Sequence, residues 1–341
     1  MNDLPYNIIQ INNILLPALP QVDKIGVRQG KMGIAIYLFQ LYKVTGKKEF
    51  EQLAEKLLEQ SIEKLSWPMP IDFSDGLTGI GYCFEYMAEQ KYIDIDTDDF
   101  LEPIDFHLQH VLYAECLPFM LLKDICIYYC KRLLGRPVET DDLKLLKLRH
   151  HVVYAIDLFY RYLKKEDIIP YFNTSNTRTT VWQYPLYLSL LGDMYRLDLF
   201  NHKVCQLLNL CLAAASRLQI GNLTAENDLN LLVTLCELKE ILNKEERLSF
   251  HFDPFLAGLE KHIDKRREDA SFTEKVRMFW LYKRLGKLNL DRRDEVGDLG
   301  EQIRSDLFHE IKNLSYGLDG LAGVGLALIS EEDVTFDMTR I

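Results

Sequence analysis

The chain has 341 residues, of which 48% are hydrophobic, and its formal net charge is −11. Nucleic acids and anionic membrane surfaces are bound through basic patches, so this acidic balance argues against both as partners. No apolar run approaches the roughly 18 residues of a membrane span, and we therefore expect no transmembrane segment.

The N-terminal residues and the cysteines indicate the cellular compartment in which the protein is expected. Residues 1–6 lack a basic region and a clear cleavage site, so we expect no secretory signal. Seven cysteines, an odd number, are scattered on apolar helical faces, which is typical of buried, reduced thiols. Together these features predict a cytoplasmic protein.

The N-terminal part of the chain reads as three helices. An apolar helix is expected over residues 2–16, ended by Pro17 and Pro20. The next is expected over residues 31–44 and stops at the C-cap signal Thr45-Gly46. Its partner, over about residues 50–65, repeats apolar side chains at steps of three and four, which indicates a helix with one buried face.

The pattern continues to the C-terminus. A helix is expected over residues 75–90, and Thr97-Asp98-Asp99 is expected to cap the helix after it. Ser271 and Glu274 fit a capping box, and no strand pattern stands out. Amphipathic helices are predicted over about residues 141–163, 199–218, 254–266 and 291–311.

One glycine-rich stretch occurs more than once. Asp75-Gly76-Leu77-Thr78-Gly79-Ile80-Gly81 returns as Asp319-Gly320-Leu321-Ala322-Gly323-Val324-Gly325, and Gly30-Lys31-Met32-Gly33-Ile34-Ala35 is a weaker third copy. Each copy opens an apolar run at helical spacing, and the aspartate that begins the first two copies suits an N-cap. Glycine inside a helix costs roughly 1 kcal/mol, and a pair three residues apart would let another backbone come very close.

The spacing of these copies predicts a repeat array. Gly76 lies 46 residues after Gly30, and Gly320 lies 244 residues after Gly76, close to five further steps. Equal steps would place the other helix starts near residues 124, 173, 222 and 271. With the N-terminal helix as partner of the last one, about seven helix hairpins result. We expect a single all-α domain over residues 1–341, closed into a ring, with six hairpins or an open solenoid as alternatives.

The repeat openings resemble those of the lanthionine synthetase C-like (LanC-like) family. The resemblance rests on the three glycine copies, on the run from Gly30 to Gly46, and on Ser315-Tyr316-Gly317-Leu318 before the last copy. It covers about residues 26–65, 72–90 and 315–330, while period alone supports the middle of the chain. The resemblance implies a double-layered α/α toroid that works in ribosomal peptide modification, where a zinc-activated cysteine thiolate adds to a dehydrated serine or threonine.

The zinc ligands that this family carries are missing here. The family supplies them from a Cys-Gly opening in the fifth repeat and a Cys-His-Gly opening in the sixth. This chain instead has Gly221-Asn222-Leu223-Thr224-Ala225-Glu226 and Ala270-Ser271-Phe272-Thr273-Glu274-Lys275. Because a catalytic zinc needs three protein ligands, we expect no metal, no cofactor and no cyclase activity.

The expected ligand surface is the mouth at which the inner helices begin. The helix dipoles and the family resemblance both point to this end of the ring. Aromatic side chains together with both acidic and basic ones at this mouth would suit a peptide ligand better than a polyanion. The candidate residues are Arg28, Gln29, Asp72, Asp75, Trp182, Tyr184, Glu226, Asp228, Tyr316 and Asp319.

Other polar residues have simpler interpretations. His150 and His151 point about 100° apart on a helix, so packing or surface roles are favoured over a shared metal. Cys126 and Cys130 are expected to form a core pair, and His107 and His110 to be solvated. Trp182 and Tyr184 pack or bind substrate. Asp72 and Asp75 are a cap or paired carboxylates, as in inverting glycosidases.

Two functions from different classes remain open at this point. The first is a LanC-like protein without the zinc site that binds a peptide or a modification-enzyme partner as an accessory component. The second is a zinc-independent enzyme on the same toroid, such as a carboxylate-based glycoside hydrolase. Fold alone does not separate them, and the sequence leaves open whether the chain is an enzyme.

Overall fold

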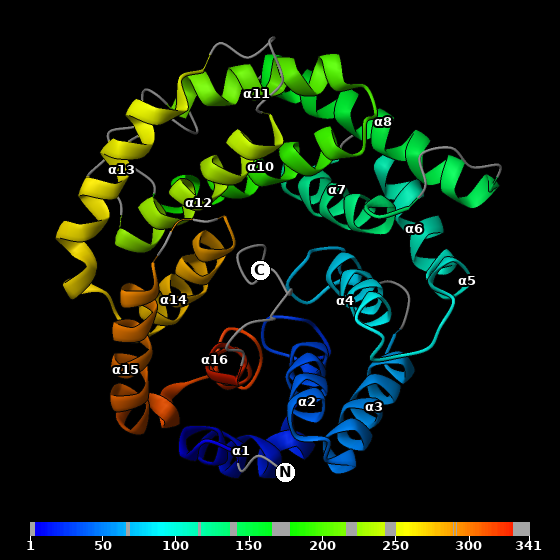
Figure 1. The fold of residues 1–341 in the computed structure, drawn as a ribbon. Helices are drawn as coiled ribbons and strands as arrows, with labels where there is room; N and C mark the ends of the chain where they lie inside the picture. The colour runs from blue at the N-terminus through cyan, green and yellow to red at the C-terminus, as the bar shows by residue number, and fades with distance from the viewer. Residues whose placement is uncertain are drawn as a thin grey trace. The chain divides into compact units, whose positions relative to one another are not determined.

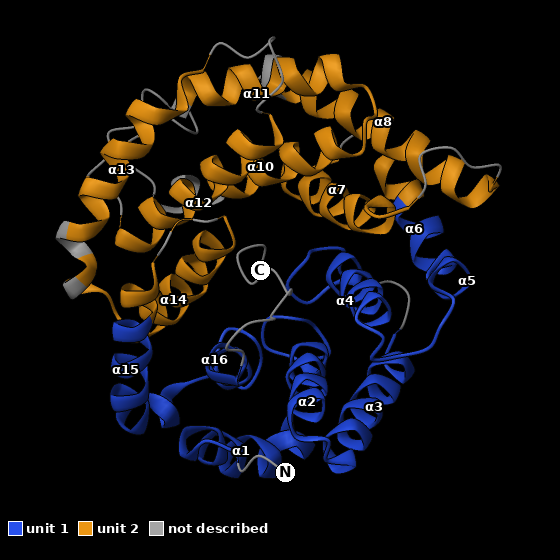
Figure 2. Cartoon of the chain, in the orientation of Figure 1, with its two compact units in different colours: residues 1–108, 297–341 blue, residues 109–296 orange. Residues whose placement is uncertain are grey.

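The structure, a computed structural model, describes residues 4–65, 69–114, 117–136, 142–165, 178–215, 224–242, 250–288, 290 and 292–329. All regular secondary structure in these ranges is helical, as the sequence predicts (Figure 1). The chain forms two compact units, residues 1–108 with 297–341 and residues 109–296, coloured separately in Figure 2. Helices α6 (Glu102–Leu112) and α15 (Arg293–Glu310) each run from one unit into the other.

The core of the first unit consists of three helices that are buried nearly all round. They are α2 (Lys31–Thr45), α4 (Leu77–Glu89) and α16 (Leu321–Ile329). Every residue from Lys31 to Leu41 and from Leu77 to Met87 is buried. Helix α2 packs against both α4 and α16. Helices that are apolar on all sides belong in the interior, which is why these three carry the glycine copies and few charges.

Amphipathic helices cover this core. Helix α3 (Lys48–Glu63) packs on α2 and buries Phe50, Ala54 and Leu57 on one face. Helix α1 (Tyr6–Ala18) packs on α16. The N-terminal helix is therefore the partner of the last helix, as the repeat predicts.

The second unit has the same two kinds of helix. The largely buried helices are α7 (Phe119–Leu133), α10 (Arg178–Arg196), α12 (Ala225–Ile241) and α14 (Phe272–Lys287), and each contacts the next. The amphipathic helices are α8 (Leu143–Lys165), α11 (Asn201–Ala215) and α13 (Phe252–Arg266). Each of these packs on the buried helix before it in the chain, and α8 also contacts α11. Consecutive hairpins thus stack side by side within this unit.

Short helical turns complete the described structure. They are α5 (Thr97–Phe100) and the 3₁₀ turns Leu19–Gln21, Arg267–Asp269 and Ile311–Asn313.

Several local predictions are confirmed. The four predicted amphipathic helices agree with α8, α11, α13 and α15 to within three residues at each end. Gly46 ends α2 in the left-handed region, with φ 68°, and its N–H donates to the Tyr42 carbonyl at 2.7 Å. Ser271 and Glu274 form the predicted capping box at the start of α14.

Other local predictions are wrong. Helix α1 includes Pro17 and ends at Ala18, and a 3₁₀ turn that contains Pro20 follows it. Asp96, rather than Thr97, caps α5 by accepting from the next N–H groups. Equal repeat steps misplace the starts of α7 and α10, since the loops differ in length. Residue 173 itself, near which a helix start is predicted, lies outside the described residues.

Candidate functional site

The three buried helices of the first unit begin with the same backbone arrangement, which we call a helix opening. The first N–H group of each helix donates to a carbonyl six or seven residues upstream, and the second donates to the carbonyl after it. The first bonds are Lys31 to Lys24 at 3.0 Å, Leu77 to Pro70 at 2.9 Å and Leu321 to Ser315 at 2.8 Å. The second bonds are Met32 to Ile25 at 3.2 Å, Thr78 to Ile71 at 3.3 Å and Ala322 to Tyr316 at 3.2 Å. A loop of main chain therefore satisfies the donors that a side-chain cap usually serves.

This arrangement corrects the predicted aspartate cap. Gly76 is the N-cap of α4, and no side chain accepts there. The Asp75 carboxylate instead has one oxygen 3.9 Å from the Lys24 ammonium. Asp72 stabilises the preceding turn, since its Oδ1 accepts from the Asp75 N–H at 3.0 Å. The predicted cap is wrong because the loop carbonyls already occupy the N–H groups that Asp75 was expected to bind.

The close approach of the loops explains the glycines. A Cβ at Gly79 would lie 1.9 Å from the Phe73 carbonyl oxygen, and one at Gly33 would lie 2.1 Å from the Val27 carbonyl oxygen. Both obstacles are backbone atoms, which cannot rotate away as a side-chain end can. A Cβ at Gly76 would likewise lie 2.4 Å from the Pro70 carbonyl oxygen, so the prediction that Gly76 and Gly79 admit another backbone is confirmed, and the partner is the helix's own loop.

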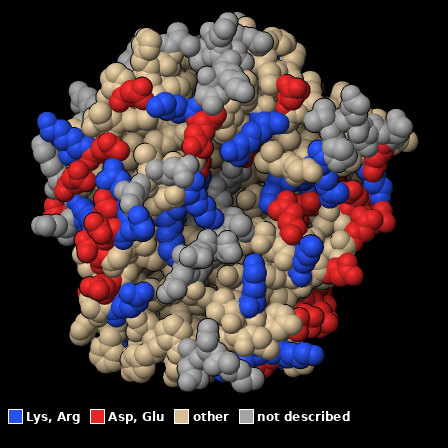
Figure 3. All heavy atoms as spheres, viewed as in Figure 1, with Lys and Arg blue, Asp and Glu red and all other residues tan. Residues whose placement is uncertain are grey.

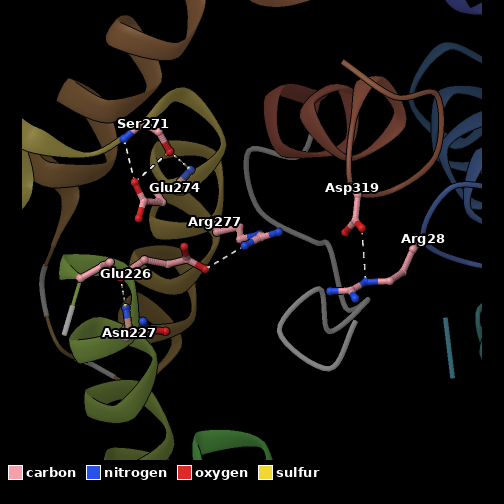
Figure 4. A network of polar contacts seen from close by, with 8 residues as sticks. Arg28, Glu226, Asn227, Ser271, Glu274, Arg277 and Asp319 are labelled. Atoms are coloured by element: carbon pink, nitrogen blue, oxygen red, sulfur yellow. Dashed lines mark hydrogen bonds and ion pairs between the residues drawn. The ribbon is translucent and has the colours of Figure 1, made fainter. Parts of the chain in front are cut away.

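The openings also contact one another within this unit. The Val27 N–H donates to the Ser74 carbonyl at 2.8 Å, which joins the first opening to the second. The Asp319 N–H donates to the Arg28 carbonyl at 2.9 Å, and Arg28 Nε lies 3.3 Å from the Asp319 carboxylate (Figure 4). The first opening thus lies between the second and the last, and Gly30, Gly76 and Gly320 belong to one contiguous cluster.

A second group of polar side chains lies in the other unit, where α12 and α14 begin. Glu226 is in the first turn of α12 and is 4% exposed. Its Oε1 lies 3.3 Å from Arg277 Nη1 on α14 (Figure 4). Its Oε2 is buried and has no hydrogen-bond partner among the described residues. Burial raises the pKa of Glu226 to about 7, and the Arg277 charge only partly opposes this shift.

The helix starts around this pair are capped by side chains. The Thr224 hydroxyl accepts from the Asn227 N–H at 3.3 Å, and Ser271 and Glu274 cap α14 reciprocally. Glu226 and Asp228 add negative charge to the first turn of α12, where the helix dipole favours it. These caps and carboxylates offset the partial positive charge at the N-termini of α12 and α14, so neither helix start attracts an anion strongly.

The ten predicted site residues divide between the two units. Arg28, Gln29, Asp72, Asp75, Tyr316 and Asp319 belong to the openings of the first unit, and Trp182, Tyr184, Glu226 and Asp228 belong to the second. The Lys24 ammonium donates to the Gln29 side chain at 2.7 Å, and the Tyr316 carbonyl is one of the loop acceptors.

Two of the predicted binding residues are core residues. Tyr184 is 1% exposed, and its hydroxyl donates to the Cys211 carbonyl of α11, so it joins two helices and presents nothing to a ligand. Asp228 is fully buried. Of the two interpretations that the sequence leaves open for Tyr184, packing and substrate binding, these contacts favour packing. The side chain of Trp182 lies outside the described residues.

His150 and His151 share a tyrosine partner, and Cys126 and Cys130 lie in the core. The Tyr113 hydroxyl lies 3.1 Å from His150 Nδ1 and 3.0 Å from His151 Nδ1. His151 is buried, and desolvation lowers its pKa to about 4. Cys126 and Cys130 are both buried, as a core pair would be. Over the ranges that the structure describes, no three His, Cys, Asp or Glu side chains are arranged to hold a metal ion.

Sequence reasoning missed Arg277 altogether. The residue lies 51 positions from Glu226, and no local pattern links the two. A weak signal exists in hindsight. Arg284 follows Arg277 by seven residues on α14 and pairs with Glu237 of α12, with Nη2 and Oε2 2.6 Å apart. The two arginines are seven residues apart on α14 and the two glutamates eleven apart on α12, and both spacings keep a pair of side chains on one helix face, which indicates a shared α12–α14 interface.

No protein-family model and no curated protein sequence matches the chain. Among the helices described, none is long and apolar enough to cross a membrane. Acidic and basic side chains both occur on the face shown in Figure 3.

Proposed function

We propose that this chain is a LanC-like protein without the zinc site, which binds a peptide as an accessory component of ribosomal peptide modification. The observation that carries the proposal is the Glu226–Arg277 pair. Glu226 lies in the first turn of α12 and Arg277 in the second turn of α14, close to the repeat starts at which the family that the sequence resembles keeps its zinc ligands. A buried carboxyl group with a strongly shifted pKa is typical of functional sites.

The repeated architecture supports the same proposal. Buried helices alternate with amphipathic ones in both units, and three openings share one backbone arrangement. The first and last repeats contact each other through Arg28 and Asp319. We propose that these hairpins complete a double-layered α/α toroid of seven pairs. The six described cysteines are thiols, which fits the proposed cytoplasmic setting.

The residues at these openings do not fit a catalytic zinc. Zinc sites of this kind use three ligands drawn from thiolate, imidazole and carboxylate groups. Glu226 offers one carboxylate, and the guanidinium beside it is a cation that has no lone pair to give. A thiolate activated by zinc is therefore not part of the proposed function.

The glycoside hydrolase alternative finds less support. An acid and a base or nucleophile must face each other across the scissile bond. Asp72 instead accepts from the backbone of Asp75 within a turn. Glu226 and Asp228 are two residues apart on one helix, so their side chains leave it about 200° apart. Neither pair has the required arrangement.

Binding of a short peptide tests the proposal. The probe is the fluorescein-labelled precursor peptide encoded beside the gene, with a scrambled peptide as reference, and fluorescence anisotropy reports binding to the full chain. We expect saturable binding of the precursor alone, and at least tenfold weaker binding by Arg277→Met. Arg284→Met is the matched control, because it breaks the other α12–α14 pair, and it should bind as wild type does.

The opposite results count against the proposal. If no precursor peptide is encoded nearby, or if it binds no better than its scrambled form, the peptide-binding function is wrong. If the chain cleaves aryl glycosides and Asp72→Asn abolishes this, the hydrolase alternative replaces it.

A further inference from the structure

Two histidines and a tyrosine of the second unit meet at one atom, the hydroxyl oxygen of Tyr113. This residue directly follows α6, and its oxygen lies 3.1 Å from His150 Nδ1 and 3.0 Å from His151 Nδ1 on α8. Neighbouring side chains leave a helix about 100° apart, which is why the sequence argues against a shared ion. The structure shows that the two rings nevertheless turn their Nδ1 atoms toward the same oxygen.

The three atoms have the spacing of neighbouring ligands around one metal ion. Bonds from zinc or copper to imidazole nitrogen are about 2.0–2.1 Å long, so neighbouring ligands lie about 2.8–3.4 Å apart in square-planar or tetrahedral sites. The two oxygen–nitrogen distances fall within this range. The ring centroids of His150 and His151 are 6.1 Å apart, which suits a square plane with the oxygen next to both nitrogens and the nitrogens opposite each other.

Packing orients these groups while leaving a route from solvent. His151 is 6% exposed, and its ring contacts those of Tyr113 and Tyr129, with centroids 5.7 and 5.6 Å away. The Tyr113 ring also contacts Tyr154 at 4.6 Å. His150 is exposed and Tyr113 is 38% exposed, so an ion can reach the hydroxyl without opening the core.

A metal ion would bind the two imidazoles alike, which the phenol cannot do. A hydroxyl has one proton to donate, so one Nδ1 can accept it and the other must donate its own N–H. With an ion present, both Nδ1 atoms offer a lone pair and Tyr113 binds as phenolate. As the metal–oxygen bond forms, the O–H bond breaks and its proton passes to solvent. Nitrogen and oxygen ligands in a square plane favour Cu²⁺, which also binds such ligands more tightly than Zn²⁺ does.

We propose that Tyr113, His150 and His151 bind a divalent transition-metal ion, Cu²⁺ more tightly than Zn²⁺, through one phenolate oxygen and two Nδ1 atoms. The three side chains come from the end of α6 and from α8, and none lies at a repeat start, where LanC-like proteins keep their zinc. The inference goes beyond the proposed peptide-binding function and does not depend on it. An ion at this site ties the segment after α6 to α8.

Copper titration of the full chain tests the inference. The protein is stripped of metal with a chelator and titrated with Cu²⁺ at pH 8 by calorimetry, with glycine as a competing ligand that keeps weak surface sites empty. We expect one ion per chain, a visible phenolate-to-copper charge-transfer band, and nitrogen ligands in the electron paramagnetic resonance spectrum. Zn²⁺ should compete for the same site with at least tenfold lower affinity.

Variants assign the three ligands. Tyr113→Phe keeps the ring and its packing but removes the oxygen, so it should bind Cu²⁺ at least tenfold more weakly and lose the visible band. His150→Ala changes an exposed side chain and should weaken binding by a similar factor. His309→Ala is the matched control, because it removes an exposed histidine of α15, and it should bind within about threefold of wild type.

A change of charge gives an independent readout. The exposed Lys147 lies four residues before His151, on the same face of α8, where its ammonium repels a bound cation. Lys147→Met should therefore bind Cu²⁺ more tightly, by about threefold. Circular dichroism melts of the metal-free variants show that each is folded before its affinity is compared.

The result that overturns the inference is an adventitious ion only. In that case wild type takes up several ions at one weak affinity, or Tyr113→Phe and His150→Ala bind as wild type does, and no charge-transfer band appears. Loss of the tight site in both variants, with His309→Ala unchanged, supports it. Because no peptide is used, neither result bears on the proposed peptide-binding function.

Discussion

Arg28 binds Asp319 through its main chain and its side chain at once. The Asp319 N–H donates to the Arg28 carbonyl at 2.9 Å, and the Arg28 Nε lies 3.3 Å from an Asp319 carboxylate oxygen. Residues near the two ends of the chain are therefore tied together within the first unit. The side chain adds an ion pair to a contact that the backbone already makes.

The ion pair should contribute modestly to stability. Asp319→Ala keeps the backbone bond and removes an ion pair whose side chains are 37% and 25% exposed, so we expect a loss of about 0.5–1 kcal/mol. Urea denaturation measures it. Asp75→Ala is the control, because its carboxylate lies 3.9 Å from Lys24 and caps no helix. A larger loss for Asp75 than for Asp319 would contradict the corrected role of these aspartates.

The glycine at the second opening should be intolerant of any side chain. In Gly79→Ala the added Cβ would lie 1.9 Å from the Phe73 carbonyl oxygen, so the loop must move off α4. We expect a destabilisation of at least about 3 kcal/mol from this overpacking. Gly286→Ala is the control on α14, where nothing lies within 4 Å, and it should be neutral or stabilising. Equal thermal midpoints for the two variants would show that the loop is not packed as described.

Glu226 should make the protein less stable as the pH rises. Its pKa is about 7 in the folded state against 4.5 for an ordinary glutamate, so the folded protein binds more protons between these values. Stability from this group is complete below pH 4.5 and is lost as the pH rises through 7. Relative to Glu226→Gln, wild type should lose about 1–3 kcal/mol over this window. Urea midpoints from pH 4.5 to 8 measure the difference, and parallel curves would refute it.

His151 should act in the opposite direction. Its pKa falls from 6.5 to about 4 on folding, so the unfolded chain binds more protons between these values. Stability from the neutral ring is complete above pH 6.5 and is lost as the pH falls towards 4. His151→Phe keeps a ring beside Tyr113 and Tyr129 but cannot titrate. The variant should therefore lose less stability than wild type on acidification, as circular dichroism melts would show. An unchanged acid slope would mean that His151 is not the titrating group.

The bounds of the amphipathic helices could be predicted closely because apolar side chains recur in them at the helical period. Helices such as α8 and α13 alternate apolar and charged residues at helical period, and that period ends where the helix ends. A helix that is buried all round has no such alternation. The start of α7 was therefore placed by equal spacing alone, several residues from its true position at Phe119.

The candidate site could be predicted only in part, because its contacts are distant in sequence. Glu226 was selected by its place in the repeat, but its partner comes from a helix 51 residues away. The role of Asp75 was misassigned because a cap made by loop carbonyls leaves no mark in side-chain composition. For Tyr184 the sequence leaves packing and substrate binding open, because an aromatic residue near a helix start has the same pattern whether it faces a ligand or the next helix.

Because main-chain loops cap the buried helices of the first unit, most side chains at the same edge are not needed to hold the fold. In the first unit, the helix donors at each opening are satisfied by main-chain carbonyls, and only the glycines are fixed by space. The remaining side chains at these positions can change without uncapping a helix. The side chains at these openings can therefore be substituted, during evolution or in a randomised library, to bind a different ligand, while the helices and their loops keep the same structure.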